Sequence, residues 1–333
     1  MEVVHFNRKK RKFANYSIEG FYKNIRNELS NKITIKTVEC PYESNGIFRR
    51  LFNSIYAAFK QSDVNHITGD VNYLNLFFRK RKNIVTILDC ATLHRLTGIK
   101  HWIVKIIWYT LPIKRAKYIV AISQATKDEI LKYVKCDPDK IKVIYVSISL
   151  IFHRVDNVFN KQKPVILHIG TAPNKNLSGL LKALNGINCK LIIIGKLTDG
   201  YIKQLYENRI DYENFVNITD EEVFEQYKAC DLLAFVSTYE GFGMPIVEAN
   251  TVGRPVITSN LLSMPEVAGD AACIVNPYNI EDIRDGILRI INDGDYRNDL
   301  IEKGFENAKR YNIERIAKEY LELYINIFNG NAY

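Results

Sequence analysis

The stretch from residue 232 to residue 255 constrains this chain more than any other part of its sequence. It opens with the apolar run 232–236, which is typical of a buried parallel strand. Gly241 and Gly243 come next, and they permit a sharp turn whose backbone can lie close to a bound ligand. Pro245 suits the first turn of a helix, where its missing N–H is not needed. The sequence therefore predicts a strand, a glycine turn and a short helix.

Two carboxylates bracket this turn and narrow what it can bind. The N–H groups at a helix start, together with the helix dipole, favour a phosphate. Glu240 precedes the turn, and Glu248 lies in the helix eight positions later. Neither is a good neighbour for a phosphate, whereas both can accept hydrogen bonds from hydroxyls. A diphosphate flanked by hydroxyl-rich groups is a nucleotide sugar; the alternative is a plain strand–loop–helix unit with two surface glutamates.

The same stretch resembles the E-x7-E segment of the retaining glycosyltransferases of family 4. The resemblance continues through residues 253–260 and 264–270. It implies the GT-B fold, an α/β architecture of two Rossmann-like domains whose parallel sheets face a central cleft. It also implies that the transferred sugar keeps its anomeric configuration and that the reaction needs no metal ion.

The length of 333 residues favours two domains of ordinary size. Strand patterns alternate with helix patterns in both halves, which favours parallel sheets. The resemblance implies an acceptor-binding domain over 1–155 and a nucleotide-sugar-binding domain over 156–311. It also implies that a last helix, within 312–333, crosses back to the first domain.

Cysteine usage and hydropathy indicate where such a chain works. The 6 cysteines are scattered without a C-x-x-C pair, which argues against a zinc site or a disulfide framework and fits a reducing cytoplasm. The apolar runs are too short to span a bilayer, and the first residues do not resemble a signal peptide. We expect a cytoplasmic protein, with peripheral attachment to the inner face of the membrane as a further option, and no cofactor.

The net charge of +9 is divided unequally between the halves. Residues 1–155 hold 28 Lys and Arg against 12 Asp and Glu, whereas the remainder holds 18 against 25. A basic half favours an anionic partner: nucleic acid, an acidic membrane surface or an acidic acceptor. Five consecutive cations, Arg8 to Lys12, follow the first predicted strand, at the edge where α/β sheets bind ligands. No nucleic-acid-binding motif is present, so nucleic acid is the least favoured partner.

The first half carries four candidates for the acceptor side. Asp89 ends a predicted strand where many family members have His-Asp, but Leu88 stands in place of that histidine. His94 lies five residues beyond Asp89 and could partly replace the missing imidazole. Ser123 and Lys127 match the serine and the basic residue that the family places toward its cleft.

Two further features of this half have competing interpretations. His66, at the end of a predicted strand, is a structural residue or a catalytic one, and the structural role is favoured. The helix pattern over 99–117 combines apolar residues with a basic edge. It indicates either an amphipathic helix at a membrane surface or a helix packed on the sheet, and the packed helix is favoured for its core.

The second half supplies the donor contacts that the resemblance implies. Gly170 and Thr171 form a turn after a buried strand, and Lys175 aligns with the family's lysine, which reaches the diphosphate as a point charge. Thr171 stands where some relatives have an arginine. Thr219 lies on the nucleobase loop, Glu248 accepts ribose hydroxyls, and Glu240 holds the sugar. The remaining donor-binding candidates are the turn residues Gly241, Phe242, Gly243 and Met244.

Three residues form the predicted catalytic set: Glu240, Asp89 and Lys175. Breaking the bond from the anomeric carbon to phosphate leaves negative charge on the diphosphate. Preorganised donors stabilise such charge by roughly 3–4 kcal/mol each. Without a nucleophile placed by sequence, a same-face mechanism is implied, in which the leaving phosphate takes the acceptor proton.

These features predict a retaining transferase that moves a hexose-type sugar from a UDP- or GDP-sugar to a glycan or lipid-linked acceptor in surface polysaccharide synthesis. One alternative is a GT-B sugar-nucleotide epimerase, which needs no acceptor. Another is a non-catalytic protein that binds nucleic acid or membrane through its basic half.

Overall fold

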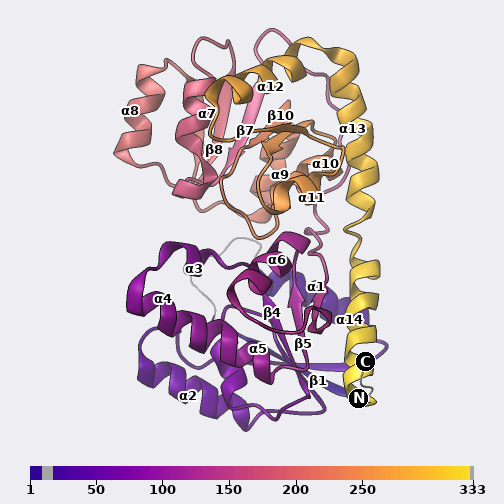
Figure 1. Ribbon diagram of the computed structural model, residues 1–333. Helices are drawn as coiled ribbons and strands as arrows, with labels where there is room; N and C mark the ends of the chain where they lie inside the picture. The colour runs from indigo at the N-terminus through magenta and orange to yellow at the C-terminus, as the bar shows by residue number, and fades with distance from the viewer. Residues whose placement is uncertain (10–17, 331–333) are drawn as a thin grey trace. The chain divides into compact units, whose positions relative to one another are not determined.

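The computed structural model describes residues 1–9 and 18–330, and the chain divides into two compact units. Unit 1 comprises Met1–Ser147 with Asn312–Tyr333, and unit 2 comprises Ile148–Tyr311 (Figure 1). Each unit is built on a six-stranded, fully parallel sheet with helices on its faces. This is the predicted α/β architecture, and it is confirmed.

The sheet of unit 1 has the strand order β2-β1-β3-β4-β5-β6. Its central strands are almost wholly buried because helices cover both faces, which is the usual state of a parallel sheet. The strands are β1 (Glu2–Asn7), β2 (Thr34–Glu39), β3 (Val64–Ile67), β4 (Asn83–Ile87), β5 (Tyr118–Ala121) and β6 (Ile141–Val143). The helices are α1 (Ile18–Leu29), α2 (Ile47–Ala58), η1 (Asn72–Leu76), α3 (Ala91–Arg95), α4 (Gly98–Val104), η2 (Lys105–Thr110), α5 (Leu111–Arg115), α6 (Gln124–Tyr133), η3 (Pro138–Lys140) and α14 (Ile313–Phe328).

The sheet of unit 2 has the order β12-β11-β10-β7-β8-β9, with β10 and β7 at its centre. The strands are β7 (Val165–Ile169), β8 (Lys190–Ile194), β9 (Asp211–Phe215), β10 (Leu232–Phe235), β11 (Val256–Ser259) and β12 (Cys273–Val275). The helices are η4 (Pro173–Lys175), α7 (Leu177–Ala183), α8 (Asp199–Glu207), α9 (Asp220–Ala229), α10 (Met244–Val252), α11 (Ser263–Ala268), α12 (Ile280–Asn292) and α13 (Gly294–Lys309).

The boundary between the units lies after Ser147, which corrects the predicted boundary at residue 155. Phe152 packs edge-on against the ring of Tyr227 in α9. The Val155 N–H donates to the carbonyl of Val252, 3.2 Å away. Arg254 is fully buried and donates to the Val155 carbonyl and to the Tyr227 carbonyl, each at 2.9 Å. These contacts attach residues 148–155 to unit 2. They join residues far apart in the sequence, so the sequence pattern does not predict them.

The residue pattern over 215–220 predicts a strand there. In the structure β9 instead occupies Asp211–Phe215 and ends before Asn217. Asn217 has a left-handed backbone with φ of 58°, which ends the extended conformation, and Thr219 already caps α9.

The last helix, α14, packs against α1 and β3 of unit 1 through a wholly buried polar network. The Tyr324 hydroxyl lies 2.9 Å from Nε2 of His5 and 2.8 Å from Nδ1 of His66. The other ring nitrogen of His66 lies 2.8 Å from the Thr86 hydroxyl, which also contacts Tyr22. His66 is therefore committed to structure, as the favoured interpretation held.

None of the helices in the described ranges combines the length and the apolar character that crossing a membrane requires.

Candidate functional site

The strand, glycine turn and helix predicted over 232–255 are present as β10, a loop and α10. Gly243 precedes α10 with φ of 107°, a conformation that strains other residues, and a Cβ there would lie 3.2 Å from Ile246. No side chain caps the first turn of α10, and Pro245 lies in that turn. The start of α10 therefore has the form of an anion site.

Two side chains outside the predicted site hold this loop. The backbone carbonyl of Asn174 accepts from the Thr238 N–H at 2.8 Å. The side-chain amide of Asn174 donates to the Tyr239 carbonyl at 2.9 Å. The hydroxyl of Ser263 contacts the carbonyl oxygens of Glu240 and Phe242 at 3.0 and 2.8 Å. Because these hydrogen bonds hold the carbonyls of Tyr239, Glu240 and Phe242, the peptide planes of the loop have a set orientation. The only signal for Asn174 in the sequence was its position next to Lys175.

Lys175 and Glu240, predicted separately as catalytic, form an ion pair with Nζ and Oε1 2.7 Å apart. Both side chains are largely buried. The lysine stem lies across Gly170, where a Cβ would come within 2.8 Å of the Lys175 Cγ, so this position requires glycine. The ammonium lies 4.9 Å from the centre of the Phe235 ring. The edge of that same ring lies 3.6 Å from the Cβ position of Gly243. Lys175 and the start of α10 are thus neighbours around one aromatic ring.

Glu248 is almost wholly buried in α10. The Tyr227 hydroxyl donates to its Oε2 at 2.8 Å. Burial raises the pKa of Glu248 to about 7, and this outweighs the lowering effect of the tyrosine hydrogen bond. The carboxyl thus changes charge near neutral pH, which the sequence did not indicate.

Two predicted donor-binding threonines serve the protein's own backbone. Thr171 donates to the Lys196 carbonyl at 2.8 Å. Thr219 caps α9 in a capping box with Glu222. Their contacts with a donor stay predictions.

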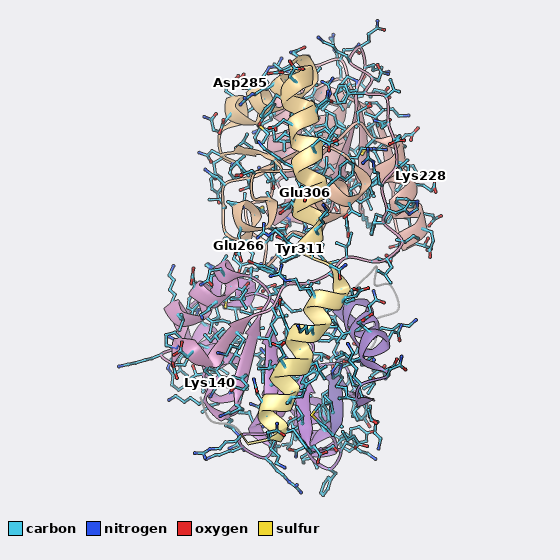
Figure 2. The ribbon with its side chains drawn as sticks, turned by 90° about the vertical axis from the view of Figure 1, so that its right-hand side faces the viewer. Lys140, Lys228, Glu266, Asp285, Glu306 and Tyr311 are labelled. Atoms are coloured by element: carbon cyan, nitrogen blue, oxygen red, sulfur yellow. The ribbon has the colours of Figure 1, made fainter. Side chains whose placement is uncertain are left out.

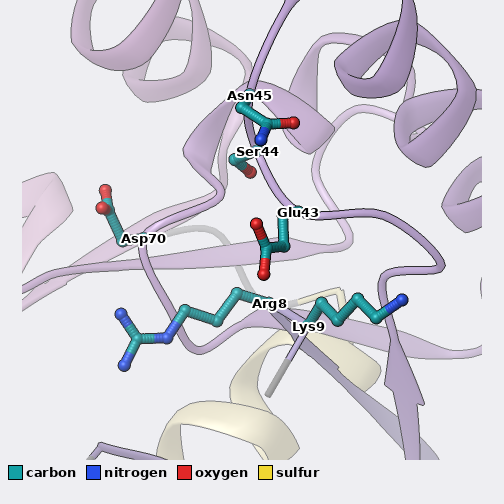
Figure 3. Close-up of a pocket in the computed structure, with 6 residues that line it drawn as sticks. All are labelled: Arg8, Lys9, Glu43, Ser44, Asn45 and Asp70. Carbon is teal, nitrogen blue, oxygen red and sulfur yellow. The ribbon is translucent and has the colours of Figure 1, made fainter. Parts of the chain in front are cut away.

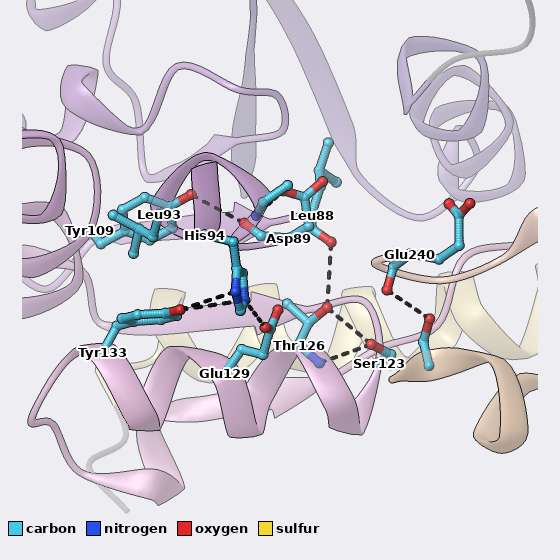
Figure 4. A network of polar contacts seen from close by, with 12 residues as sticks. Leu88, Asp89, Leu93, His94, Tyr109, Ser123, Thr126, Glu129, Tyr133 and Glu240 are labelled. Atoms are coloured by element: carbon cyan, nitrogen blue, oxygen red, sulfur yellow. Dashed lines mark hydrogen bonds and ion pairs between the residues drawn. The ribbon is translucent and has the colours of Figure 1, made fainter. Parts of the chain in front are cut away.

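In unit 1 the acceptor-side candidates Asp89, His94 and Ser123 belong to one polar network (Figure 4). His94 contacts the Glu129 carboxylate through Nε2, and the Tyr133 hydroxyl lies 3.4 Å from the same ring. The Thr126 hydroxyl lies between Ser123, at 3.0 Å, and the Leu88 carbonyl, at 3.4 Å.

The members of this network differ in accessibility. Asp89 accepts the Ala91 N–H at 2.8 Å, and burial raises its pKa above the ordinary value. Ser123 is fully buried and caps α6, so its side chain is a structural element of that helix. Lys127 lies in the first turn of α6, and its predicted role rests on the resemblance alone.

A cavity of about 350 Å³ opens in unit 1 beyond the carboxyl ends of β1 and β3 (Figure 3). Cations, carboxylates and neutral polar groups all line it: Arg8, Lys9, Glu43, Ser44, Asn45 and Asp70. Arg8 and Lys9 belong to the predicted basic loop, and the rest of that loop, Lys10 to Lys12, lies outside the described residues. Glu43 and Asp70 were not predicted, although both follow strands at the sheet edge where ligands bind.

Comparison with known proteins identifies the region that holds the donor-type site. Residues 151–307 match the family model described as glycosyl transferases group 1. The chain is 29% identical over 233 residues to the O-antigen chain mannosyltransferase B of Escherichia coli, covering 63% of this chain and 60% of that protein. It is 30% identical over 220 residues to the O-antigen chain mannosyltransferase RfbU of Salmonella typhimurium, covering 60% and 59%. The chain thus spans about 60% of the length of these relatives.

Solved structures agree with the chain over nearly its whole length. Sucrose-phosphate synthase from Thermosynechococcus elongatus matches with a TM-score of 0.82 and 13% identity, covering 99% of this chain and 100% of that one. Anabaena HepE in complex with UDP and glucose matches with a TM-score of 0.76 and 15% identity, covering 97% and 99%. Residues 151–307 are therefore similar to the glycosyl transferases of group 1, and the chain has the GT-B fold.

Proposed function

We propose that the protein is a retaining glycosyltransferase that moves a hexose-type sugar from a nucleotide sugar to a glycan or lipid-linked acceptor during surface polysaccharide synthesis. The observation that carries this proposal is the Lys175–Glu240 ion pair beside the uncapped start of α10, inside the region that matches the transferase family. The relatives are named O-antigen mannosyltransferases, which makes mannose the first sugar to test.

The chemistry follows from the charges. A sugar diphosphate at the start of α10 meets backbone N–H groups and the positive end of the helix dipole. Lys175 is held nearby by Glu240 and supplies a cation as negative charge develops on the departing diphosphate. Glu240 keeps a second carboxylate oxygen for a sugar hydroxyl, and Glu248 serves the ribose. Asp89 in unit 1 is the predicted partner of the acceptor or sugar hydroxyls.

The donor and the role of Lys175 can be tested together. A thermal-shift panel of UDP- and GDP-sugars, GDP-mannose included, should raise the melting temperature for the true donor, because ligand present well above its Kd stabilises the folded state. Lys175→Ala should abolish that shift and lower kcat/KM by about 10²–10³-fold, the scale of one lost transition-state donor. Lys203→Ala, which removes an exposed ammonium 3.7 Å from Glu207, is the matched control.

Turnover by Lys175→Ala at the wild-type rate would show that Lys175 is not part of the donor site. Donor consumption that proceeds equally well without any acceptor would instead support the epimerase alternative. A panel in which no nucleotide sugar shifts the melting temperature would contradict the transferase proposal itself.

A further inference from the structure

Helix α2 presents its large apolar side chains to solvent and buries two polar ones. The residues that it buries are Asn53, Ser54 and Ala57. Its opposite face carries an exposed apolar stripe at helical spacing: Ile47, Phe48, Leu51, Phe52 and Ile55, continued by Phe59 just after the helix. Phe48 is 87% exposed and Phe59 is 85% exposed. A surface helix of a soluble domain normally has the reverse arrangement.

Specific hydrogen bonds fix this orientation. The Asn53 amide accepts from the Tyr42 N–H at 3.1 Å and donates to the Tyr42 carbonyl at 2.8 Å. The same amide lies 3.2 Å from the Tyr73 hydroxyl in η1. Turning the apolar stripe inward would break these contacts and carry the Asn53 amide away from its partners. The exposed stripe is therefore a fixed feature of unit 1.

A second exposed apolar segment adjoins the first. Helix α4 has no buried residue, and Ile99, Trp102 and Ile103 are exposed, Trp102 by 63%. The chain continues from α4 into η2, where Trp108 lies 4.5 Å from the guanidinium of Arg50 in α2. Figure 1 shows α2 and α4 along the same edge of unit 1. The sequence favoured a packed helix over 99–117; η2 and α5 do pack, whereas α4 contacts the core through Val104 at its end and leaves Ile99, Trp102 and Ile103 exposed.

The charge around this apolar surface is predominantly positive. Residues 47–115 contain 12 Lys and Arg against 3 Asp, and neither α2 nor the segment 98–115 contains an acidic residue. Arg49 and Lys100 are exposed on the two helices. A second copy of the chain would bring like charges together, because a twofold contact sets a surface against itself. An anionic lipid surface instead satisfies both the aromatic stripe and its cations.

We propose that α2 and α4 form a docking surface that inserts its apolar side chains into an anionic membrane interface. The docking surface consists of the α2 stripe with Phe59, the three exposed apolar residues of α4, and Arg49 and Lys100. Helices of this kind lie in the interface plane with the apolar face about 5–10 Å deep. The cavity of unit 1 adjoins the surface, because its lining residue Asn45 accepts from Arg49 of α2 at 2.6 Å. If the proposed function holds, a lipid-linked acceptor is met at this edge, but docking itself does not depend on that reaction.

Sedimentation with vesicles tests the surface. The full chain is mixed with vesicles of phosphatidylcholine alone or with about 30% phosphatidylglycerol. Wild-type protein should bind the anionic vesicles and release at high salt. The variant Phe48→Ser with Phe52→Ser should bind at least about tenfold more weakly, because each lost ring removes buried apolar area. Tyr206→Ser, which removes an equally exposed aromatic ring from unit 2, should bind as the wild type does.

Tryptophan emission gives an independent reading, because both tryptophans, Trp102 and Trp108, lie in unit 1. Anionic vesicles should shift the emission to shorter wavelength, and Trp102→Phe should remove the shift. Equal vesicle binding by wild type and the Phe48/Phe52 variant, or no wild-type binding at low salt, would overturn the proposal. So would a wild-type dimer in light scattering that becomes a monomer in the same variant, since that assigns the surface to a second copy.

Discussion

At the scale of single residues, Glu240 and Glu248 have opposite environments although the sequence presents them as a matched pair. Glu240 forms an ion pair with Lys175 and keeps partial access to solvent. Glu248 meets a tyrosine hydroxyl in a nearly dry position, and its pKa rises to about 7. A sugar hydroxyl that donates to Glu248 would favour its charged form and offset part of the cost of burial.

This difference predicts a pH-dependent stability. The folded-state pKa of Glu248 lies above the ordinary 4.5, so the folded protein holds a proton that the unfolded chain releases between pH 4.5 and 7. Stability from this group is therefore present below pH 4.5 and is lost as pH rises through 7. Glu248→Gln should be more stable than wild type at pH 8, by at most roughly 3 kcal/mol, and the gap should close toward pH 5.

The difference in stability between the wild type and Glu248→Gln is measured by hydrogen exchange of unit 2 peptides at rising urea concentration, at each pH. Glu306→Gln, at an exposed carboxylate paired with Lys309 (Figure 2), is the control and should leave the stability at both pH values unchanged. A stability difference between the two proteins that is the same at pH 5 and pH 8 would contradict the titration of Glu248 in this range.

At the scale of elements, α14 shows how a helix from the far end of the chain is held to unit 1. Its tyrosines complete the buried network with His5 and His66, and both histidines must stay neutral there. Burial lowers the pKa of His66 to about 3, and burial together with the charge of the other histidine lowers that of His5. The contact is specific because each ring nitrogen needs its partner, a requirement that an apolar interface lacks.

Acid should therefore weaken unit 1. Below the ordinary pKa of 6.5 the unfolded chain binds protons that the folded network excludes, so stability falls as pH drops from 6.5 toward 3. At pH 5 the loss should be about 2 kcal/mol for His66. His66→Gln should lose part of this pH slope, whatever its own stability at pH 7, whereas exposed His153→Gln should keep it.

Tryptophan fluorescence during urea unfolding reports this slope, because unit 2 contains no tryptophan. An unchanged slope in His66→Gln would show that the network is not the acid-sensitive element.

At the scale of the whole molecule, donor and acceptor functions are assigned to different units. The matched family region and the Lys175–Glu240 pair lie in unit 2, whereas the charged cavity and the docking surface lie in unit 1. The charge asymmetry of the sequence follows the same division. The cytoplasmic location and the lack of a need for a metal ion stay predictions.

This division predicts that a substitution in unit 1 can change the acceptor KM without changing the donor KM. Asp70→Asn removes a carboxylate from the unit 1 cavity and should raise the acceptor KM by about tenfold, the scale of one lost charged hydrogen bond. The donor KM should stay the same, because the proposed donor site lies in unit 2. Initial rates with each substrate varied in turn measure both constants, and Asp199→Asn on α8 is the control. A change confined to the donor KM would contradict a role for the unit 1 cavity in binding the acceptor.

The sequence by itself determined the features that depend on neighbours along the chain. The order of strands and helices, the glycine turn after β10 and the short helix α10 all follow from apolar runs, glycines and prolines within a few residues of one another. The family resemblance rested on the same local pattern. For this reason the architecture and the form of the donor-type turn were predicted correctly.

Only the tertiary structure decided features that depend on residues far apart in sequence. Lys175 reaches Glu240 across 65 positions, and Tyr227 and its surroundings bury Glu248. Glu43 and Asp70 meet in one cavity because β2 and β3 flank β1 in the sheet. The stripe on α2 would suit a core as well as a surface, and the hydrogen bonds of Asn53 decide between them. Packing is a non-local property, so the pattern that names a helix does not say which of its faces meets the protein.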